Sequence, residues 1–387
     1  MIGSESESEL IQTITKEILK VKSKRMHLFV PRYQVGLDSH AKNVELLLDP
    51  RRNNVQMVGI YGVGGVGKTT ITKAVYNNIV DHFDEGIFLE NVCEMSKTNE
   101  GTIQLQNKLL SKSLRDSCSN VNSVPEGITM IKDRLCRQKL LLVLDDVNDR
   151  KEIENLLGDC DWFAAGSRII ITTRDKQVLN TLGNPGVYKV EELDLHEALE
   201  LFSWHAFHRS EPKADYLQLS KQVIKYAKGL PLALEVLGSR LRGRNHSEWQ
   251  CELQEYEVIP AEGIQKVLEQ SFKRLEQIEK DVFLDIACFF KGWDKAYVMN
   301  MLEACGLYPK SVIPKLIDKC LITVDQFGKL SMHDLIQQMG REIVRKESSE
   351  YPGQCSRLWY YKDALDVLNE NTVCLLLFIF IFHRHRW

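Results

Sequence analysis

The sequence feature that most constrains the fold is a run of glycines between an apolar segment and an amphipathic one, within residues 55–83. Residues 55–61 are mostly apolar and predict a buried strand, whereas residues 71–79 repeat apolar side chains at helical spacing. The four glycines between them can adopt positive φ and direct successive N–H groups toward an anion, beside the positive end of the following helix. The chain is therefore expected to contain an α/β domain built around a phosphate-binding loop.

Residues 62–69 fit the P-loop pattern G-x-x-x-x-G-K-[ST], in the strand-loop-helix context that this motif requires. Lys68 is expected to reach the β- and γ-phosphates of a nucleotide, and the Thr69 hydroxyl to take a Mg²⁺ ligand position. Thr70 can add a contact to the α-phosphate. An ordinary glycine-rich turn with a surface lysine is the weaker interpretation. The residues predicted to bind nucleotide here are Gly62, Gly64, Gly65, Val66, Gly67, Lys68, Thr69 and Thr70.

Two aspartates and an arginine follow later apolar runs and predict further parts of the same site. Asp145 and Asp146 come after the apolar residues 140–144, as in a Walker-B motif. In that role Asp145 holds Mg²⁺ through its water shell, and Asp146 orients or deprotonates the attacking water. Aspartate pairs also occur in turns, but the P-loop favours the catalytic interpretation. Arg174 closes the next predicted strand, where it can sense a γ-phosphate; a solvated strand-end arginine remains the alternative.

The order of apolar and amphipathic segments predicts the fold class. Near-continuously apolar strands alternate with helices, which indicates a parallel sheet covered on both faces. The predicted strands are residues 55–61, 86–92, 140–144, 168–173 and 187–190. From residue 194 to residue 320 the patterns are helical. A short hairpin, 321–324 with 329–331, then indicates a winged helix. We expect an α/β P-loop NTPase domain followed by an α-helical domain and a winged-helix domain.

Composition narrows the class of protein. The 387 residues allow two or three domains, and the net charge of −3 provides no overall basic field for nucleic acid or anionic lipid. The ten cysteines lack C-x-x-C spacing and favour a reducing, intracellular setting; Cys136, Cys288 and Cys320 are expected to be core residues. No secretion signal is visible at the N-terminus. The apolar run 373–382 is about half of the ~20 residues needed to cross a bilayer, so no membrane association is expected.

Seven sequence blocks carry a resemblance to a known family. The chain closely resembles the NB-ARC module of plant TIR-type NLR disease-resistance proteins, a branch of the STAND signalling ATPases, from about residue 35 to residue 371. The blocks are GVGGVGKTT (62–70), LLLVLDDV (140–147), GSRIIITTRD (166–175), GLPLALEVLGS (229–239), FLDIACFF (283–290), MHDLIQQMGREIV (332–344) and PGQCSRLW (352–359). The aspartate closing the second block and the wording of the fifth both look like the TIR class.

The resemblance implies a division of the chain. Its parts are a linker helix (1–30), a P-loop nucleotide-binding domain (31–192), an ARC1-like helical domain (193–258), an ARC2-like winged-helix domain (259–371) and an aberrant apolar tail (372–387). Neither a TIR domain nor the leucine-rich repeats are recognised, so no TIR-type NAD-cleaving activity is expected of this chain. The block that usually reads V-G-[IL]-[DE]-S-R has His40 in place of its arginine, which leaves open one contact near the nucleotide.

The resemblance also implies a function, an ADP/ATP-dependent switch of a cytoplasmic or nucleo-cytoplasmic plant immune receptor. ADP would be bound in the off state and ATP in the on state, with Mg²⁺ and at most slow hydrolysis. Val35 and Gly36 would line the adenine, Pro231 would press on the base or ribose, and His333 would reach the β-phosphate of ADP. Besides nucleotide, the implied partners are other receptor chains or signalling proteins. The alternatives are a turnover ATPase and a winged-helix DNA-binding regulator; nucleic acid is the less favoured partner because the chain is acidic.

Overall fold

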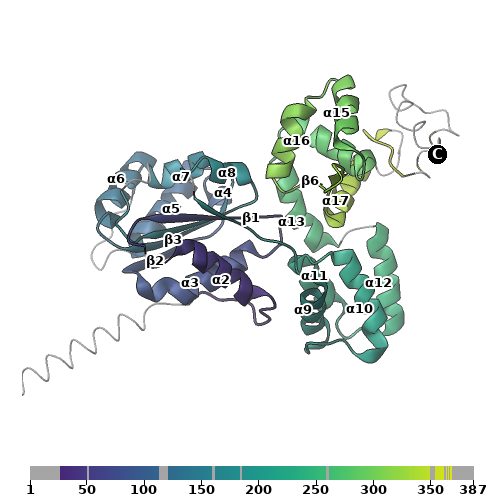
Figure 1. Ribbon diagram of the computed structural model, residues 1–387, viewed down its shortest axis with the longest axis horizontal. Helices are drawn as coiled ribbons and strands as arrows, with labels where there is room; N and C mark the ends of the chain where they lie inside the picture. Colours follow the sequence, from purple (N-terminus) through teal and green to yellow (C-terminus); the bar gives the residue numbers. More distant parts are fainter. Residues whose placement is uncertain are drawn as a thin grey trace, which may run out of the picture. The chain divides into compact units, whose positions relative to one another are not determined.

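The computed structural model describes most of the chain and divides it into two compact units (Figure 1). The described residues are 27–49, 52–112, 121–158, 162–183, 185–258, 261–348, 354–360, 363, 365 and 367. The first unit holds residues up to Ile60, then Lys68–Thr173 and Val178–Lys189. The second holds Tyr61–Gly67, Arg174–Gln177 and the chain from Val190 onward. Most of the predicted linker helix and the whole predicted tail lie outside the described residues.

A five-stranded parallel sheet forms the centre of the P-loop fold, as predicted, and its strand order is β2-β3-β4-β1-β5. The strands are β1 (Gln56–Tyr61), β2 (Glu85–Leu89), β3 (Leu140–Val147), β4 (Arg168–Thr173) and β5 (Gly186–Lys189). Every residue of β4 is buried, and β3 is buried at all but one position. Strands covered on both faces need apolar side chains on both faces, which is why these two read as unbroken runs of Leu, Val and Ile.

Helices cover both faces of this sheet. On one face α2 (Leu37–Leu48) packs beside α3 (Lys68–Ile79), and on the other α5 (Asn99–Lys112), α6 (Val124–Leu135) and α7 (Arg150–Leu157) pack together (Figure 1). The short η1 (Val80–His82), α4 (Val92–Met95) and α8 (Lys176–Asn180) complete the connections. The sequence pattern predicts a second strand over residues 86–92, but residues 92–95 form a helical turn, and the residue before it, Asn91, has a left-handed φ of 56°.

The third strand extends further than predicted. Residues 145–147 belong to β3, and its register with β4 shifts between Leu144 and Val147. Asp146 has φ 59° at this irregularity, a conformation that aspartate tolerates better than most residues. The two aspartates therefore lie within the last residues of β3 and not after the strand. The irregularity in the register changes the directions of their side chains.

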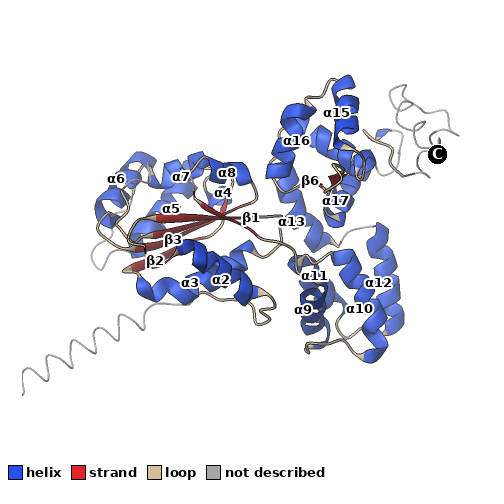
Figure 2. Cartoon of the chain, in the orientation of Figure 1, coloured by secondary structure: helices blue, strands red, loops and turns tan. Residues whose placement is uncertain are grey.

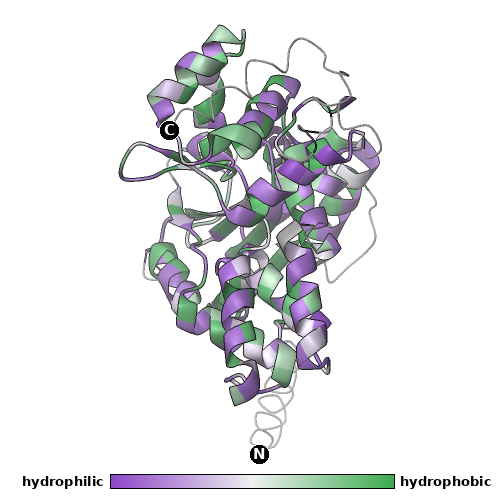
Figure 3. Cartoon of the chain, turned by 90° about the vertical axis from the view of Figure 1, so that its right-hand side faces the viewer, coloured by the Kyte–Doolittle hydropathy of each residue, from purple (hydrophilic) through white to green (hydrophobic). Residues whose placement is uncertain are grey.

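A layer of helices follows the sheet in sequence: α9 (Leu195–Phe207), η2 (Ala214–Tyr216), α10 (Leu217–Ala227), α11 (Pro231–Leu241) and α12 (His246–Val258) (Figure 2). An aromatic cluster lies within them. Trp249 is 1% exposed, stacks on Phe207 at 5.5 Å and donates its indole N–H to the Leu241 carbonyl. The helices carry hydrophobic and hydrophilic residues together in Figure 3, as amphipathic helices do.

The remaining described elements form the predicted winged helix. They are α13 (Glu262–Lys273), α14 (Gln277–Asp285), the π-helical turn η3 (Ile286–Phe290), α15 (Lys295–Ala304), α16 (Pro309–Asp318), β6 (Thr323–Val324), β7 (Leu330–Ser331) and α17 (Asp334–Arg345). The hairpin β6–β7 is antiparallel, as expected. Residues 292–295 add a third antiparallel segment that the sequence did not reveal: Gly292 N–H donates to Leu330 O at 2.7 Å and Leu330 N–H to Trp293 O at 2.8 Å.

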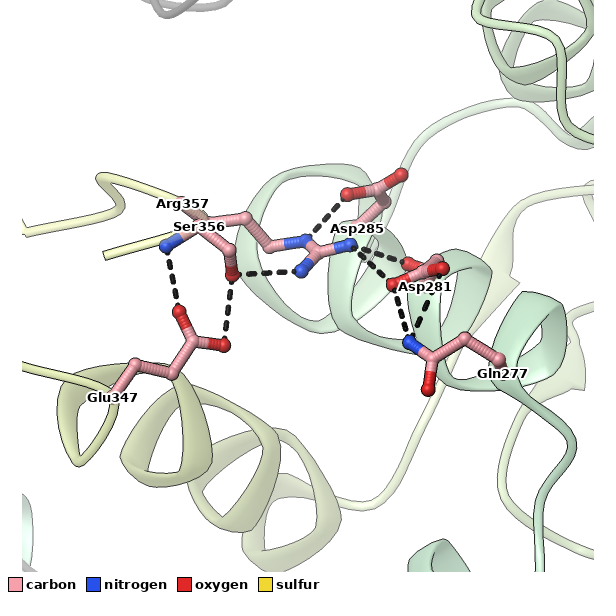
Figure 4. Close-up of polar contacts among 6 residues, drawn as sticks. All are labelled: Gln277, Asp281, Asp285, Glu347, Ser356 and Arg357. Atoms are coloured by element: carbon pink, nitrogen blue, oxygen red, sulfur yellow. Dashed lines mark hydrogen bonds and ion pairs between the residues drawn. The ribbon is translucent and has the colours of Figure 1, made fainter. Parts of the chain in front are cut away.

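A polar network fixes the segment that follows α17 (Figure 4). Arg357 donates from Nε to Asp285 Oδ1 at 2.6 Å and from Nη2 to the Asp281 carbonyl at 3.0 Å. Ser356 donates through its N–H and its hydroxyl to the carboxylate of Glu347. The pKa of Asp285 is nonetheless raised, because burial outweighs the arginine. Arg357, from the block that reads PGQCSRLW in the sequence, thus attaches this part of the chain to α14.

The composition predicts that three cysteines are core residues and that the chain does not associate with a membrane. All seven described cysteines are free; Cys288 is buried as predicted, whereas Cys136 and Cys320 are only half-buried. Within the described ranges, no helix combines the length and the apolar character needed to cross a bilayer. The domain boundaries inferred at residues 192/193 and 258/259 stay predictions.

Candidate functional site

The loop between β1 and α3 has the backbone that a phosphate-binding loop needs. Gly65 and Gly67 have φ of 84° and 101°, in the left-handed region that side chains with a Cβ rarely enter. Helix α3 begins at Lys68, so the loop ends on the first N–H groups of a helix. Lys68 itself is only 8% exposed. A lysine held at a helix N-terminus with its charge largely buried can neutralise an anion there.

Two loop glycines lie close to other residues of the second unit, to which the loop itself belongs. A Cβ at Gly64 would lie 2.8 Å from Nη1 of Arg174, and a Cβ at Gly65 would lie 2.9 Å from the Leu232 side chain. The Gly65 carbonyl accepts the Leu232 N–H at 3.2 Å. These positions are therefore small because other parts of the protein approach them closely.

A hydroxyl–carboxylate cluster joins the start of α3 to the ends of β3 and β4. Thr69 Oγ1 lies 3.0 Å from each carboxylate oxygen of Asp145. Thr172 Oγ1 donates to Asp145 Oδ1 at 2.6 Å and accepts the Asp146 N–H at 2.8 Å. The structure thus brings together two residues predicted as Mg²⁺ ligands, and adds Thr172, which the sequence analysis missed. The alternation of the strand RIIITT gave no sign that its fifth residue would face the aspartates.

Burial perturbs the Asp145 carboxyl. The side chain is 3% exposed, and burial raises its pKa above the usual value, while the hydrogen bonds from Thr172 and Thr69 act in the opposite direction. A buried carboxylate with two hydroxyls beside it is suited to a divalent cation, since Mg²⁺ prefers oxygen ligands. The donor set therefore fits the predicted metal.

Arg174 lies in contact with α13, within the second unit. Its Nη1 donates to the Val267 carbonyl at 3.0 Å and to Ser271 Oγ at 3.2 Å, and its Nη2 donates to Gln270 Oε1 at 3.1 Å. The guanidinium also abuts Gly64 of the loop. It is half-buried, so the solvated strand-end arginine that the sequence left open does not describe it.

The residues expected at the base end precede α2. Gly36 is the N-cap of α2 with φ 70°, a conformation that favours glycine. One turn later His40 places Nδ1 2.6 Å from the Tyr188 hydroxyl of β5, with the rings edge to face. The histidine that replaces the usual arginine is therefore engaged by the sheet edge.

Pro231 and His333 both lie in the second unit. Pro231 is the first residue of α11, a position that needs no N–H donor. His333 caps α17: its Nδ1 accepts the Leu335 N–H, which leaves the proton on Nε2, 3.3 Å from the Lys228 carbonyl. Lys228 is three residues before Pro231. Burial lowers the pKa of His333, so the ring is neutral near pH 7.

Asp334, next to His333, connects two lysines. It pairs with Lys291 at the end of η3 and with Lys228 at the end of α10, the latter at 3.3 Å. Although burial acts to raise it, the Lys291 and Lys228 charges hold the pKa of Asp334 below its usual range. One carboxylate thereby links α17, the winged-helix turn and the preceding helical segment.

The placement of the candidate residues can be stated by unit. Lys68, Thr69, Thr70 and the aspartates belong to the first unit, with Val35 and Gly36. The loop glycines, Val66, Arg174, Pro231 and His333 belong to the second. The division falls between Gly67 and Lys68, which are consecutive in the chain.

Two family models match the chain. Residues 38–212 match the NB-ARC domain, and residues 276–348 match the winged-helix domain described as Roq1-like disease resistance protein. The first match contains the loop, both aspartates and Arg174, and the second contains His333. Both matches agree with the order of elements found in the structure.

Curated relatives cover most of this chain. It is 45% identical over 355 residues to disease resistance protein RUN1 of Vitis rotundifolia, which is 91% of this chain and 26% of that protein. It is 40% identical over 342 residues to TMV resistance protein N of Nicotiana glutinosa, which is 87% of this chain and 30% of that protein. The chain thus spans about a quarter to a third of the length of these relatives.

A solved structure shares the fold. The Walker-type ATPase PABY2304 of Pyrococcus abyssi superposes with a TM-score of 0.57 over 81% of this chain and 99% of that chain. The sequence identity is 15%, so the likeness concerns the fold alone. It places the sheet, the loop and the helices that follow among the P-loop ATPase architectures.

Proposed function

Because this chain carries an NB-ARC domain and a Roq1-like winged-helix domain and is homologous over that region to plant TIR-type disease resistance proteins, we propose that it is an ADP/ATP-dependent switch. Its P-loop fold implies nucleotide binding. We further propose which nucleotides bind, which residues distinguish ADP from ATP, and how the bound nucleotide changes the conformation.

The observation that carries the proposal is the contact of Thr69 with both oxygens of Asp145, at the start of the P-loop helix and beside the buried Lys68. A hydroxyl and a carboxylate thus lie within hydrogen-bond distance of each other at the end of an anion-binding loop. Thr69 and Asp145 would hold Mg²⁺, directly or through water. Mg²⁺ held there would supply positive charge against the phosphates of the nucleotide.

In this proposal, different residues of the protein bind different groups of the nucleotide. The N–H groups of the loop, including Gly62, Gly64 and Val66, hold the phosphates, and Thr70 binds the α-phosphate. Lys68 neutralises the β- and γ-phosphates. Val35 and Gly36 line the adenine, and Pro231 presses on the base or ribose. The family resemblance supports the assignments of Val35, Gly36 and Pro231. The hydrogen bond from the Leu232 N–H, next to Pro231, to the Gly65 carbonyl also supports the assignment of Pro231.

Switching follows from two residues that would contact different nucleotides. His333 carries its Nε2 proton toward the Lys228 carbonyl and would instead donate to the β-phosphate of ADP. Arg174 would contact the γ-phosphate of ATP, and to do so would exchange its hydrogen bonds to α13. A ligand shifts a conformational equilibrium only by its difference in affinity for the two states. Competition between α13 and a phosphate for one guanidinium supplies such a difference.

Hydrolysis would be slow and would reset the switch. Asp146 would orient or deprotonate the attacking water, and its backbone is held in position by Thr172. A turnover ATPase is the second candidate, because the same aspartates serve either. Rapid steady-state hydrolysis that is lost in Asp146→Asn would favour it over the switch.

The wider role is proposed from the relatives. The module would work in the cytoplasm or nucleo-cytoplasm within an immune receptor that signals by assembling with other receptor chains or signalling proteins. A DNA-binding role for the winged helix is disfavoured by the net charge of −3.

The test is the identity and dependence of the bound nucleotide. The purified chain is denatured, the released nucleotide is identified by chromatography, and ADP binding is measured by calorimetry. We expect ADP in the parent protein and none in Lys68→Ala, because the variant leaves the phosphates without their main counter-charge. Lys73→Ala, which removes a lysine of the same helix that pairs with Glu90 at 2.6 Å, is the matched control and should retain ADP.

Recovery of no nucleotide, together with ADP and ATP binding that does not depend on Lys68, would reject the proposal. If the protein adopts the same conformation with ADP bound as with ATP bound, the switch is rejected while nucleotide binding stays intact, because a ligand with equal affinity for both states shifts nothing.

A further inference from the structure

A buried arginine lies at the end of the sheet opposite to the phosphate loop. Arg168 begins β4 and is 1% exposed. Its guanidinium donates to five backbone carbonyls: Leu48 at 2.6 Å, Asp49 and Arg52 at 2.7 Å, Asn54 at 2.9 Å and Ser167 at 3.0 Å. Burial lowers the pKa of Arg168 from its usual value. A buried charge is costly unless it is fully hydrogen-bonded, so this arrangement has a structural purpose.

The carbonyls identify what the arginine holds. Leu48 is the last residue of α2, and Asp49, Arg52 and Asn54 belong to the turn that leads into β1. The last carbonyls of a helix have no partners within the helix and carry its negative end. Arg168 therefore caps α2 and fixes the following turn at the amino end of β4, with a single side chain.

Helix α2 connects the end that Arg168 binds to the other end of the sheet. Its 12 residues span about 18 Å, and its N-cap is Gly36. Near that end, His40 bonds to Tyr188, the third residue of the edge strand β5. In between, Glu45 accepts a hydrogen bond at 2.8 Å from Asn78 of the P-loop helix. The helix is thus attached to a different element at each end and in its middle.

The two ends of α2 lie at opposite edges of the sheet. Arg168 is at the amino end of β4, whereas Tyr188 is near the carboxyl end of β5, and the strands are parallel. Ligands of open α/β sheets bind at the carboxyl edge. The end of α2 that Arg168 does not touch is therefore the end at which Val35 and Gly36 lie.

We infer that Arg168 is a positioning residue for the base end of the nucleotide site, acting through α2, which works as a strut between the two edges of the sheet. The inference rests on the proposed function, because Val35 and Gly36 are assigned to the adenine there. It adds that the affinity for the base, as distinct from the phosphates, depends on a side chain on the far side of the domain.

Lysine cannot replace this arginine. The five acceptors surround a planar fork, and the donors leave Nε, Nη1 and Nη2 in fixed directions. An ammonium has three donors on a flexible stem and would leave at least two of these buried carbonyls without a partner. Arg168→Lys keeps the charge and removes the geometry, which makes it the informative variant.

The experiment compares two ligands on the full chain. Binding of ADP and of inorganic pyrophosphate, which has no base, is measured by calorimetry in the parent protein, Arg168→Lys and Tyr188→Phe. In Arg168→Lys we expect ADP affinity to fall about tenfold or more, equivalent to about 1.4 kcal/mol, with pyrophosphate affinity unchanged. Tyr188→Phe removes the hydrogen bond to His40 at the near end of α2, so it should lower ADP affinity by a smaller factor and also leave pyrophosphate affinity unchanged.

Controls separate this inference from simple misfolding and from the proposed function. Arg52→Lys changes an exposed arginine of the same turn, whose side chain pairs with Asp49 at 3.1 Å, and should alter neither affinity. Lys68→Ala should remove both ligands. Equal loss of ADP and pyrophosphate in Arg168→Lys, or no loss of either, would overturn the inference, and so would an unchanged ADP affinity in Tyr188→Phe should Arg168→Lys fail to fold. Absence of ADP binding in the parent protein would instead overturn the proposed function.

Discussion

At the scale of single residues, Thr172 is hydrogen-bonded to both aspartates of the candidate site, although the sequence did not predict it as a site residue. Its hydroxyl donates to Asp145 and accepts from the Asp146 backbone, and it is 1% exposed. One hydroxyl thus orients the carboxylate that would face Mg²⁺ and holds the left-handed backbone of its neighbour.

Replacing Thr172 by valine is expected to affect both stability and metal-linked binding. Thr172→Val keeps the volume but leaves the Asp146 N–H without its acceptor, which should cost about 1–3 kcal/mol of unfolding free energy. ADP affinity should fall more with Mg²⁺ present than with a chelator, because Asp145 loses a hydrogen bond that orients it. Urea unfolding and calorimetry measure the two effects.

An exposed threonine provides the comparison. Thr129 of α6 donates its hydroxyl to the Pro125 carbonyl at 3.1 Å, and Thr129→Val should change the free energy of unfolding little and the ADP affinity not at all. If Thr172→Val lowered ADP affinity equally with and without Mg²⁺, the assignment of Asp145 to the metal would be contradicted.

The sequence located most candidate side chains but not their partners. The glycine pattern, Lys68 and the aspartates follow from local motifs, because a P-loop is read from consecutive residues. The acceptors of Arg174 are nearly a hundred residues away on α13, and the carbonyls that Arg168 binds belong to α2 and the turn after it. Such contacts depend on how elements pack, which spacing along one segment does not encode.

At the scale of elements, α13 is the partner of the candidate γ-phosphate sensor. Gln270 and Ser271 present an amide oxygen and a hydroxyl to the guanidinium of Arg174 from consecutive positions of the helix. Weakening this face of α13 should make Arg174 more available to a phosphate without touching the loop.

The double variant Gln270→Ala with Ser271→Ala should therefore raise the affinity for ATP relative to ADP by roughly three- to tenfold, equivalent to about 0.6–1.4 kcal/mol. Competitive binding of the two nucleotides measures the ratio. Lys266→Ala changes the same helix at an exposed ion pair with Glu262 and should leave the ratio as it is. A ratio unmoved by the double variant would mean that α13 does not compete for Arg174.

Asp334 links α17 to Lys228 and Lys291, and this link should depend on pH. The folded pKa is lowered, so the carboxylate contributes stability that is present above the unfolded pKa of about 3.9 and lost as pH falls through the folded pKa. Asp334→Asn should accordingly be less stable than the parent at pH 7, by no more than about 1 kcal/mol because the side chain is half exposed, and equal to it at low pH.

The same carboxylate should affect nucleotide release. Asp334→Val is expected to loosen the ADP-bound state, since the helix that carries His333 loses its attachment to Lys228. The rate of ADP release, followed with a fluorescent analogue, should rise. Glu303→Val, which removes an exposed partner of Lys310 on the neighbouring helices, serves as the control. Parent-like ADP retention in Asp334→Val would contradict the forecast.

At the scale of the whole molecule, nucleotide binding and folding should be coupled. A ligand that binds the folded state and not the unfolded one stabilises the folded state by mass action. With ADP at about a hundred times its dissociation constant, the free energy of unfolding should rise by about 2.7 kcal/mol. Differential scanning calorimetry with and without ADP measures the shift.

In Lys68→Ala the shift should disappear, and in Lys73→Ala it should persist. An ADP-dependent shift that survives in Lys68→Ala would place the ligand away from the loop and contradict the site proposed here.

The overall architecture was predictable because its signals are local and repeated. Apolar strands such as β4 and the turn at 325–328 of the wing show themselves in a few consecutive residues. The third segment of the wing was not predictable: residues 292–295 read as a break between helices, and they pair with β7 only because the hairpin returns beside them. The same holds for the extension of β3 through the aspartates, which a neighbouring strand makes possible.

The close approach of Arg174 to Gly64 has a consequence for how this loop can diverge over time. Gly64 does not have the positive φ of Gly65 and Gly67, and among the described residues the atom nearest to a Cβ placed there is Nη1 of Arg174. An alanine at this position would push the guanidinium aside, so in natural variants we expect alanine in the loop more often where the arginine has been lost.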